Sequence, residues 1–491
     1  MKKLKTAVSL LLTVLIVGSC LAVPVSASPL TAEEWEKYYD DASSDALKGI
    51  IMQPGSNDTQ RNFSWYADKN ASSCEVLIAD NAEMNGAASF KGALGSTYQG
   101  DKRARVTVTD LKAETTYYYT CVSDGFKSDV YSFSTGSDEF SAMVTSDIHI
   151  GGEKDDTDSV KEISFTFSSA VAQAKEFSRA NGREISAILS SGDQASSGFR
   201  SEFVGLTSSP EIKSLDFATA VGNHDRAGVD YRFFKSVPNE YSGLVDAYQG
   251  NDYWFVKGSV LFLVMNSNNG SGIDHRAFVQ KAVKANPDVK WRVALMHHDL
   301  WGQTIPSREN ENNFLRILWT PIFDEFNIDL VLLGHSHCFS VSNVMYNKES
   351  VESITNGSEI TNAKGTVYMV SGSLTRSRGN KGDYGKNIGI GIDNSERIVC
   401  SVIDFNRSDI TVRTYNVEDS SLYATFKLVK TDDNQPVKFS AARSLASRFV
   451  NLCGTIYAFF NNFTIIRKLK SKGYDVSIFD IIFNKNGSSF C

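Results

Sequence analysis

The chain has 491 residues, 42% of them hydrophobic, which is enough to bury the cores of two or three domains and excludes global disorder. Its formal net charge of -7 at pH 7 and isoelectric point near 5.6 leave no basic surface of the kind that binds a nucleic-acid backbone. A nucleic acid is therefore not the expected partner, whereas a small phosphate ester remains compatible with this composition.

The N-terminus has the three parts of a secretory signal peptide. Lysines among the first five residues precede an apolar run from Ala7 to Val17, and small residues occupy the cleavage positions before Ser28. A retained membrane helix would need about 20 apolar residues, and Gly18 and Pro24 interrupt the run too soon. We expect a signal peptide over residues 1–27 and a secreted or extracytoplasmic protein, with lipidation at Cys20 as the weaker alternative.

The remaining cysteines are too few and too scattered for a disulfide scaffold. They are Cys74, Cys121, Cys338, Cys400, Cys453 and Cys491. Cys74 and Cys121 fall on two predicted strands of one small domain. One bridge between them and two free buried thiols are equally compatible with the sequence.

Residues 28–50 form a polar leader, either a surface helix or a linker. From 51 to 137 the chain consists of short runs rich in β-branched and aromatic residues, separated by Gly, Asn and Asp. Examples are Phe63–Tyr66, Glu75–Ile78, Arg105–Val108 and Tyr117–Thr120. This spacing predicts an all-β sandwich of about 85 residues.

Apolar strand-like runs alternate with longer helical stretches from 138 to 416, and this alternation predicts α/β layering. The predicted helices are Val160–Ala180, Asp274–Ala285 and Phe314–Phe326. The predicted strands are Phe140–Thr145, Ile185–Ser190, Leu215–Val221, Tyr253–Asn266, Trp291–Met296 and Ile328–Leu333, followed by Gly365–Val370 and Arg397–Tyr415.

Residues 417–491 form a C-terminal extension whose role the sequence does not reveal. Phe449–Ile466 is apolar on balance and precedes several basic residues, as a membrane anchor would. However, Asn451, Asn461 and Asn462 lie within it, and polar groups are costly at the centre of a bilayer. We expect a partly buried or surface helix rather than an anchor, which leaves membrane or cell-wall association open.

Five of the six strands predicted before residue 340 end in side chains that bind metals. They lead into Asp147–His149, Gly192–Asp193, Gly222–Asp225, His297–Asp299 and Gly334–His337. Six of the seven histidines lie in these clusters, and only His275 lies elsewhere. Because ligands bind beyond the carboxyl ends of strands in α/β sheets, we expect all five clusters at one edge of the sheet.

These side chains also limit which ions can bind. Carboxylate, amide and imidazole groups without thiolate favour Fe, Mn or Zn over an all-oxygen calcium site. There are too many ligands for one ion. A pair of ions about 3.5 to 4 Å apart fits the set, and such pairs hold both the attacking and the leaving oxygen of a phosphoryl displacement.

The five ordered motifs resemble those of the calcineurin-like metallophosphoesterase family. The preceding residues, Gln60–Trp65 and Thr115–Tyr119, resemble the fibronectin-like N-terminal domain of purple acid phosphatases. This resemblance implies a four-layer αββα sandwich of the α/β class, preceded by an all-β fibronectin-like sandwich.

The resemblance also implies a role for each motif residue. Asp147, His149 and His337 would hold one ion, Asn223, His297 and His335 the other, and Asp193 would bridge the two. A hydroxide between the ions would be the nucleophile. His224 would protonate the leaving oxygen and Asp225 would orient it.

Two positions depart from purple acid phosphatases. Ser196 stands where those enzymes have an iron-bound tyrosinate, so no purple colour is expected, and His149 is a ligand position that they usually lack. Metal identity and pH optimum therefore stay open.

Substrate contact is considered for one metal ligand and for one residue beside a ligand. Asn223 and His298 are candidates to contact substrate phosphate, although adjacent residues on a strand face opposite sides, so His298 is better explained by an outer, supporting role. By the same argument Cys338 should point away from the metals and be structural.

The preferred interpretation is a hydrolase of small phosphomonoesters. A phosphodiesterase or nucleotidase on the same metal site is the alternative, because loops choose the substrate. A cell-surface binding protein with a vestigial metal domain is the non-enzymatic alternative. It is disfavoured because all the metal ligands are present.

Overall fold

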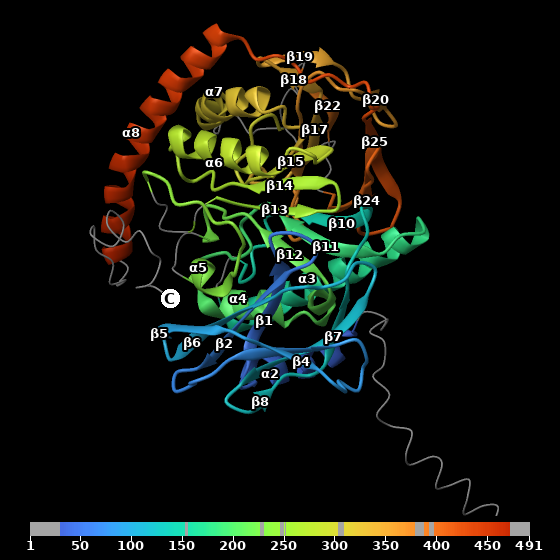
Figure 1. The fold of residues 1–491 in the computed structure, drawn as a ribbon, viewed down its shortest axis with the longest axis vertical. Helices are drawn as coiled ribbons and strands as arrows, with labels where there is room; N and C mark the ends of the chain where they lie inside the picture. Colours follow the sequence, from blue (N-terminus) through green and yellow to red (C-terminus); the bar gives the residue numbers. More distant parts are fainter. Residues whose placement is uncertain are drawn as a thin grey trace, which may run out of the picture.

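The computed structural model describes residues 30–152, 156–225, 230–245, 250, 252–302, 309–378, 387–391 and 397–471. An all-β unit lies against a layered α/β unit (Figure 1). The predicted signal peptide lies outside the described residues.

The polar leader forms helix α2 (Ala32–Ser44), which begins with a capping box between Thr31 and Glu34. Trp35 and Tyr39 are buried against helix α3 (Thr157–Ala180), and the Trp35 indole N–H donates to the carbonyl of Lys161. The leader is therefore a docked helix and not a linker.

The all-β unit consists of two sheets packed face to face. Their strands are β1 (Lys48–Pro54), β2 (Arg61–Asp68), β3 (Glu75–Ala79), β4 (Ala88–Lys91), β5 (Ala93–Tyr98), β6 (Asp101–Val108), β7 (Thr116–Ser123), β8 (Phe126–Lys127) and β9 (Tyr131–Ser134). One sheet has the order β1-β2-β6-β5; the other has β4-β3-β7-β8, with β9 also on β7. Phe63, Trp65 and Tyr119 fill the core between them. Cys74 and Cys121 are free buried thiols in this core.

The α/β unit contains two seven-stranded sheets. The first has the order β12-β11-β10-β23-β24-β25-β20 and the second β13-β14-β15-β16-β21-β17-β22. The first consists of β10 (Phe140–Thr145), β11 (Ile185–Ser190), β12 (Asp216–Thr219), β20 (Glu359–Thr361), β23 (Val399–Phe405), β24 (Asp409–Asn416) and β25 (Leu422–Val429). The second consists of β13 (Tyr253–Lys257), β14 (Val260–Val264), β15 (Trp291–Leu295), β16 (Leu330–Leu333), β17 (Phe339–Ser342), β21 (Val367–Ser371) and β22 (Ile388–Gly391), beside the small hairpin β18 (Val344–Tyr346) and β19 (Glu349–Glu352).

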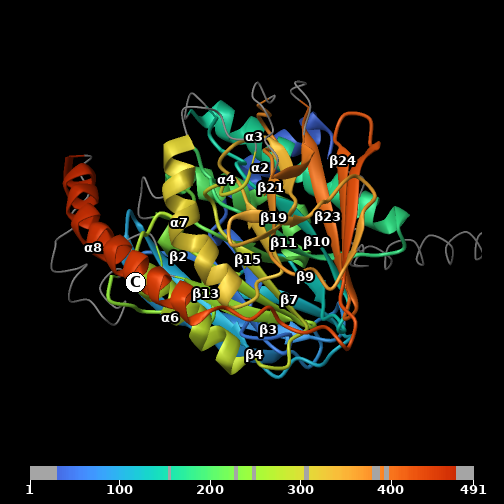
Figure 2. The same cartoon turned by 90° about the horizontal axis from the view of Figure 1, so that it is seen from above.

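Helices cover the outer face of each sheet (Figures 1 and 2). Helices α2, α3 and α4 (Arg200–Ser208), the short 3-10 helix η1 (Pro210–Ser214) and α5 (Asp230–Phe234) share an apolar core with the first sheet. Helices α6 (Gly272–Ala285) and α7 (Glu309–Glu325) share another with the second sheet. Phe140, Phe262 and Leu332 lie in a third core between the sheets. The expected αββα layering is confirmed, and Cys338 lies in the inter-sheet core, as expected of a structural residue.

Two predicted single strands are hairpins. Residues 253–266 turn at Gly258, whose φ of 53° favours glycine, and residues 397–415 turn between β23 and β24. In each hairpin one arm is fully buried, β14 in the first and β23 in the second, whereas the other arm alternates between buried and half-buried residues. The first sheet also continues past residue 416, since β25 pairs with β24.

A buried ion cluster joins the all-β unit to the α/β unit. Arg61 on β2 contacts Asp216 on β12 at 2.6 Å, and the Lys257 ammonium contacts the other oxygen of Asp216 at 2.8 Å. All three side chains are at most 4% exposed. Nearby, Arg200 pairs with Asp101 and with Asp230, and its guanidinium lies over the ring of Tyr66. The all-β unit therefore braces the strand that leads into Asn223.

The C-terminal segment forms the long helix α8 (Ala441–Ser471), which packs on α6 and α7. The expectation of a surface helix is thus met. Among the residues that the structure describes, no helix combines the length and the apolar content needed to cross a bilayer.

We predict that Asp216→Asn lowers the free energy of unfolding by about 3–5 kcal/mol, because it leaves the buried Arg61 and Lys257 facing a neutral amide. Urea denaturation measures this change. Glu184→Gln is the matched control, since Glu184 pairs with Arg179 on the surface, where an ion pair contributes less than about 1 kcal/mol. Equal losses in the two variants would contradict the bracing role.

Candidate metal centre

The predicted ligands emerge at the carboxyl ends of strands from both sheets. Asp147, Asp193 and Asn223 follow β10, β11 and β12 of the first sheet, and His297 and His335 follow β15 and β16 of the second. The expectation that all clusters lie on one edge of one sheet is therefore wrong. They meet where the ends of two facing sheets adjoin, which a one-dimensional pattern of strands cannot distinguish from a single sheet.

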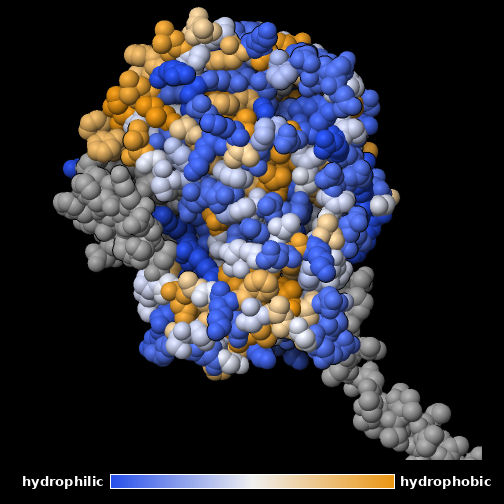
Figure 3. Space-filling model, viewed as in Figure 1, coloured by the Kyte–Doolittle hydropathy of each residue, from blue (hydrophilic) through white to orange (hydrophobic). Residues whose placement is uncertain are grey.

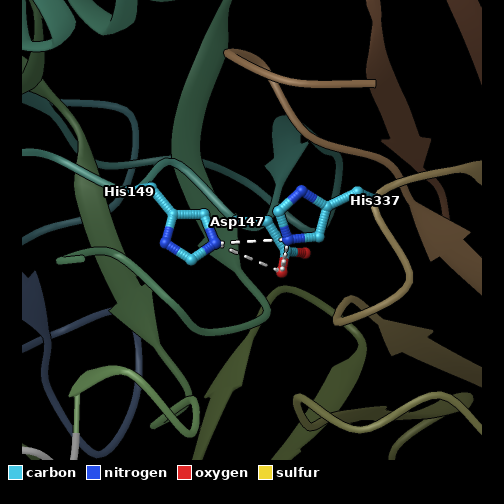
Figure 4. Close-up of side chains that lie close together, drawn as sticks. All are labelled: Asp147, His149 and His337. Carbon is cyan, nitrogen blue, oxygen red and sulfur yellow. Dashed lines mark hydrogen bonds and ion pairs between the residues drawn. The ribbon is translucent and has the colours of Figure 1, made fainter. Parts of the chain in front are cut away.

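One group of ligands contains Asp147, His149 and His337, whose side chains converge (Figure 4). The Nε2 atoms of His149 and His337 are 3.2 Å apart, and Oδ1 of Asp147 lies 3.3 Å from Nε2 of His337. The other oxygen of Asp147 accepts the backbone N–H of His335 at 2.9 Å. This leaves Asp147 Oδ1 facing the two imidazoles.

A second group lies beside it and contains Asp193, Asn223, His297 and His335. The Nε2 atom of His297 lies 3.2 Å from Oδ2 of Asp193, 3.1 Å from Oδ1 of Asn223 and 3.2 Å from Nδ1 of His335. The ligand atoms of Asp193, His297 and His335 all lie within 4.8 Å of one another, close enough to hold one cation.

Asp193 belongs to both groups. Its Oδ2 atom lies 3.2 Å from Nε2 of His297 and 3.7 Å from Nε2 of His149. Its Oδ1 atom accepts the backbone N–H of His224 at 2.8 Å, which fixes the orientation of the carboxylate. The position is that of a shared ligand.

The hydrogen bonds of the imidazoles show that the site suits cations. Nδ1 of His297 donates to the carbonyl of Ser191, and Nδ1 of His337 donates to that of Arg376. In the neutral rings, their Nε2 atoms therefore carry lone pairs directed toward other ligand atoms. Lone pairs facing one another repel unless a cation or a proton lies between them, so this donor set fits two metal ions.

The backbone is also specialised at the ligands. Asp147, His149, Asp193, His335 and His337 all have φ between 51° and 72°, a conformation that costs about 1–3 kcal/mol at a non-glycine residue. Gly222 and Gly334 allow close approach, because a Cβ at either position would collide with Asp193 or with Ser146 and Asp147. Strain concentrated at five ligand positions indicates a functional site.

Burial and charge shift the pKa values of these groups in opposite directions. Burial opposes ionisation of Asp193, but the nearby His297 outweighs it and lowers the carboxyl pKa to about 2. Burial likewise opposes protonation of His297, but Asp193 raises its pKa to about 9. Burial lowers the pKa of His149 to about 4. A metal ion would thus displace the proton on His297, and metal affinity should rise with pH as that proton leaves.

His224 lies at the mouth of the site. Its ring meets that of His149 edge-on with centroids 4.7 Å apart, and Nδ1 donates to the carbonyl of Ser196 at 2.6 Å. The expected orientation by Asp225 is wrong. The Asp225 carboxylate is buried and accepts the backbone N–H groups of Ala195 and Gly222 instead, which supports the loops behind the ligands.

His298 has a supporting position. Its Nδ1 contacts the hydroxyl of Ser267 at 2.8 Å, and its ring lies 4.6 Å from that of His335. It does not line the cavity at the metal ligands. Glu311, which the sequence did not single out, lies 3.4 Å from Nε2 of His335, whose Nδ1 contacts His297.

A cavity of about 560 Å³ opens over the two ligand groups. Besides the predicted residues, Ser197, Thr375, Arg376 and Arg378 line it. Sequence reasoning missed the arginines because they follow β21 in a segment without a motif. The backbone of this segment contacts His337 twice, through the carbonyl of Arg376 and the N–H of Arg378.

Two family models match this chain. Residues 140–339 match the calcineurin-like phosphoesterase model, and residues 47–135 match the purple acid phosphatase N-terminal domain. Among curated proteins, an uncharacterized protein of Mycobacterium tuberculosis is 26% identical over 186 residues, which is 31% of this chain and 34% of the relative. The chain thus spans about a third of the length of the curated relatives it matches.

Solved structures show the same fold. A purple acid phosphatase from yellow lupin seeds superposes with a TM-score of 0.63 at 14% identity, covering 79% of this chain and 75% of that one. A structure of PhoD gives a TM-score of 0.53 at 11% identity and covers 84% and 99%. The fold is therefore a mixed α/β metallophosphoesterase fold preceded by an all-β domain.

We predict that Asp193→Asn lowers the metal content of the purified protein from roughly two ions to one or none, because a neutral amide cannot neutralise two neighbouring cations. His224→Ala should retain both ions. Elemental mass spectrometry measures both. Equal metal loss in the two variants would refute the separate roles of ligand and proton donor.

Proposed function

We propose that this chain, which carries a calcineurin-like phosphoesterase domain behind a purple acid phosphatase N-terminal domain, hydrolyses small phosphate monoesters with two bound metal ions. The observation that carries this proposal is the position of Asp193 Oδ2 between His149 and His297. One carboxylate shared by two sets of ligands is the arrangement that places two cations next to one phosphoryl group.

The two groups of ligands described above would each hold one ion. Asp147, His149 and His337 would hold one ion, Asn223, His297 and His335 the other, and Asp193 both. When bound, such ions lower the pKa of water and neutralise the charge of the phosphoryl oxygens. Fe, Mn and Zn all suit these nitrogen and oxygen ligands.

His224 has the geometry of the proton donor to the leaving oxygen. Because the carbonyl of Ser196 accepts its Nδ1–H, the opposite nitrogen is available to the cavity that His224 lines. This hydrogen bond takes the place of the expected one to Asp225.

Arg376 and Arg378 support the preference for monoesters. Both line the cavity opened by the ligand groups. A phosphate monoester carries more negative charge than a diester, so the positive charge of these two lining residues favours it, and each charge-assisted hydrogen bond contributes about 1.5–3 kcal/mol.

We predict that the metal-loaded protein cleaves a nitrophenyl phosphate monoester with kcat/KM at least about ten-fold above that for the bis(nitrophenyl) diester. Steady-state assays with added Mn, Fe or Zn measure this ratio. A large preference for the diester would replace the monoesterase assignment by the phosphodiesterase one. Absence of turnover with every metal would favour a binding protein with a vestigial centre.

Arg376→Ala and Arg378→Ala extend the same assay. Each should raise KM for the monoester roughly ten- to hundred-fold while changing diester cleavage less. Both backbone contacts to His337 survive these substitutions, so metal content should not change. Loss of metal, or equal effects on both esters, would contradict a role in substrate charge recognition.

The site would act outside the cytoplasm, a proposal supported by the signal-like pattern of residues 1–27. Protein recovered from its native host should then begin at Ser28 when its N-terminal peptide is sequenced by mass spectrometry. A lipidated N-terminus at Cys20 would support the lipoprotein alternative. An intact Met1 in the cytoplasmic fraction would contradict export.

A further inference from the structure

Helix α8 lies along the outside of the α/β unit, beside α6 and α7 (Figures 1 and 2). Its inner face fits closely against them. A Cβ at Gly454 would meet the carbonyl of Gly270 and the side chain of Leu318, and the Thr455 hydroxyl accepts the backbone N–H of Ile273. The helix is thus fixed on the body along one side.

The side of α8 that faces the body carries small and polar residues. The residues buried there are Ser447, Asn451, Gly454, Thr455 and Ala458. Their spacing of three and four residues places them on one face of the helix. A surface helix of a globular protein normally buries its large apolar residues instead.

The opposite side of α8 carries the large apolar residues. Leu445, Phe449, Leu452, Ile456, Phe459 and Phe460 are all exposed, with Leu445 at 73%, Phe449 at 68% and Phe460 at 65%. Their spacing also follows the helical repeat, about 150° around the helix from the buried face. We call this set the α8 ridge; it contributes to the hydrophobic surface over α8 in Figure 3.

The apolar surface continues from the ridge onto α7. Tyr457 on α8 contacts the ring of Phe314 with centroids 5.9 Å apart, and Phe314 and Ile317 of α7 are exposed. Seven of the fifteen large hydrophobic side chains exposed among the described residues lie on α8. Each square ångström of apolar surface left in water costs about 25 cal/mol. So many exposed apolar side chains on one helix therefore indicate a surface that binds a partner.

The charge of α8 indicates the kind of partner. Residues 441–471 contain five basic residues and no acidic one, in a chain whose net charge is -7. They are Arg443, Arg448, Arg467, Lys468 and Lys470. Arg443 pairs with Asp324, whereas Arg448 and Arg467 are exposed. A partner that covers the ridge therefore meets positive charge along its edge and at its C-terminal end.

We propose that the α8 ridge docks on the surface of an anionic lipid bilayer, with the helix lying in the plane of the interface. From Leu445 to Phe460 the ridge is about 23 Å long, and the basic residues on the same helix favour an anionic surface as its partner. Apolar side chains enter the acyl boundary while basic residues contact anionic headgroups. Packing on α6 and α7 holds the inner face of the helix against the protein.

Vesicle flotation of the purified full-length chain tests this proposal. The chain should float with vesicles of phosphatidylcholine mixed with phosphatidylglycerol, remain at the bottom with phosphatidylcholine alone, and be released by high salt. Phe449→Ser combined with Ile456→Ser should reduce the floated fraction at least about ten-fold. Arg448→Glu combined with Arg467→Glu should reduce it on anionic vesicles as well.

The matched control is Phe126→Ser combined with Leu422→Ser, which removes two exposed apolar side chains far from α8 in sequence, on β8 and β25, and should float like the unmodified chain. Unchanged circular dichroism and thermal unfolding show that each variant is folded. Failure to float, or flotation that survives loss of the ridge, would overturn the proposal. Self-association that needs the ridge, without flotation, would identify a second copy of the chain as the occupant instead.

Discussion

The shared carboxylate of Asp193 is the interaction on which the rest of this structure depends. Its Oδ2 atom lies within 4 Å of ring nitrogens from two separate groups of histidines, and its Oδ1 atom is held by the backbone N–H of His224. Two cations about 3.5 to 4 Å apart repel strongly in a buried site, so a negative charge between them is required. The strand ends, the glycines and the left-handed backbone at the ligands all serve to hold that geometry.

The energy for this geometry comes from elsewhere in the fold. Five ligands adopt strained backbone conformations, each costing about 1–3 kcal/mol. That strain is tolerated because the strands before them are fully buried between apolar layers, as Val144 and Leu332 are. In addition, the buried ion cluster of Arg61, Asp216 and Lys257 joins β12 to the all-β unit. The all-β unit therefore stabilises one of the strands that present the site, in addition to any role of its own.

Much of the site could be predicted from the sequence because strand ends carry the ligands in a fixed order. Every predicted metal ligand lies in one of the two groups, although their roles at a loaded centre remain predictions. The two-sheet arrangement could not be predicted from strand order alone, since buried strands of either sheet have the same apolar pattern. The predicted hydrogen-bond partner of His224, Asp225, was wrong. The actual partner is the backbone carbonyl of Ser196, and a sequence motif does not identify backbone partners. Arg376 and the outward ridge of α8 depend on three-dimensional neighbours. The asparagines within Phe449–Ile466 indicated a surface helix, but not which face it buries.

The most direct test of the central claim is anomalous X-ray diffraction from crystals of the metal-loaded protein. The shared-carboxylate arrangement predicts two anomalous peaks about 3.5 to 4 Å apart, each within bonding distance of the Asp193 carboxylate. One peak must lie beside His149 and His337 and the other beside His297 and His335. A single peak, or two peaks of which only one contacts Asp193, would contradict the account.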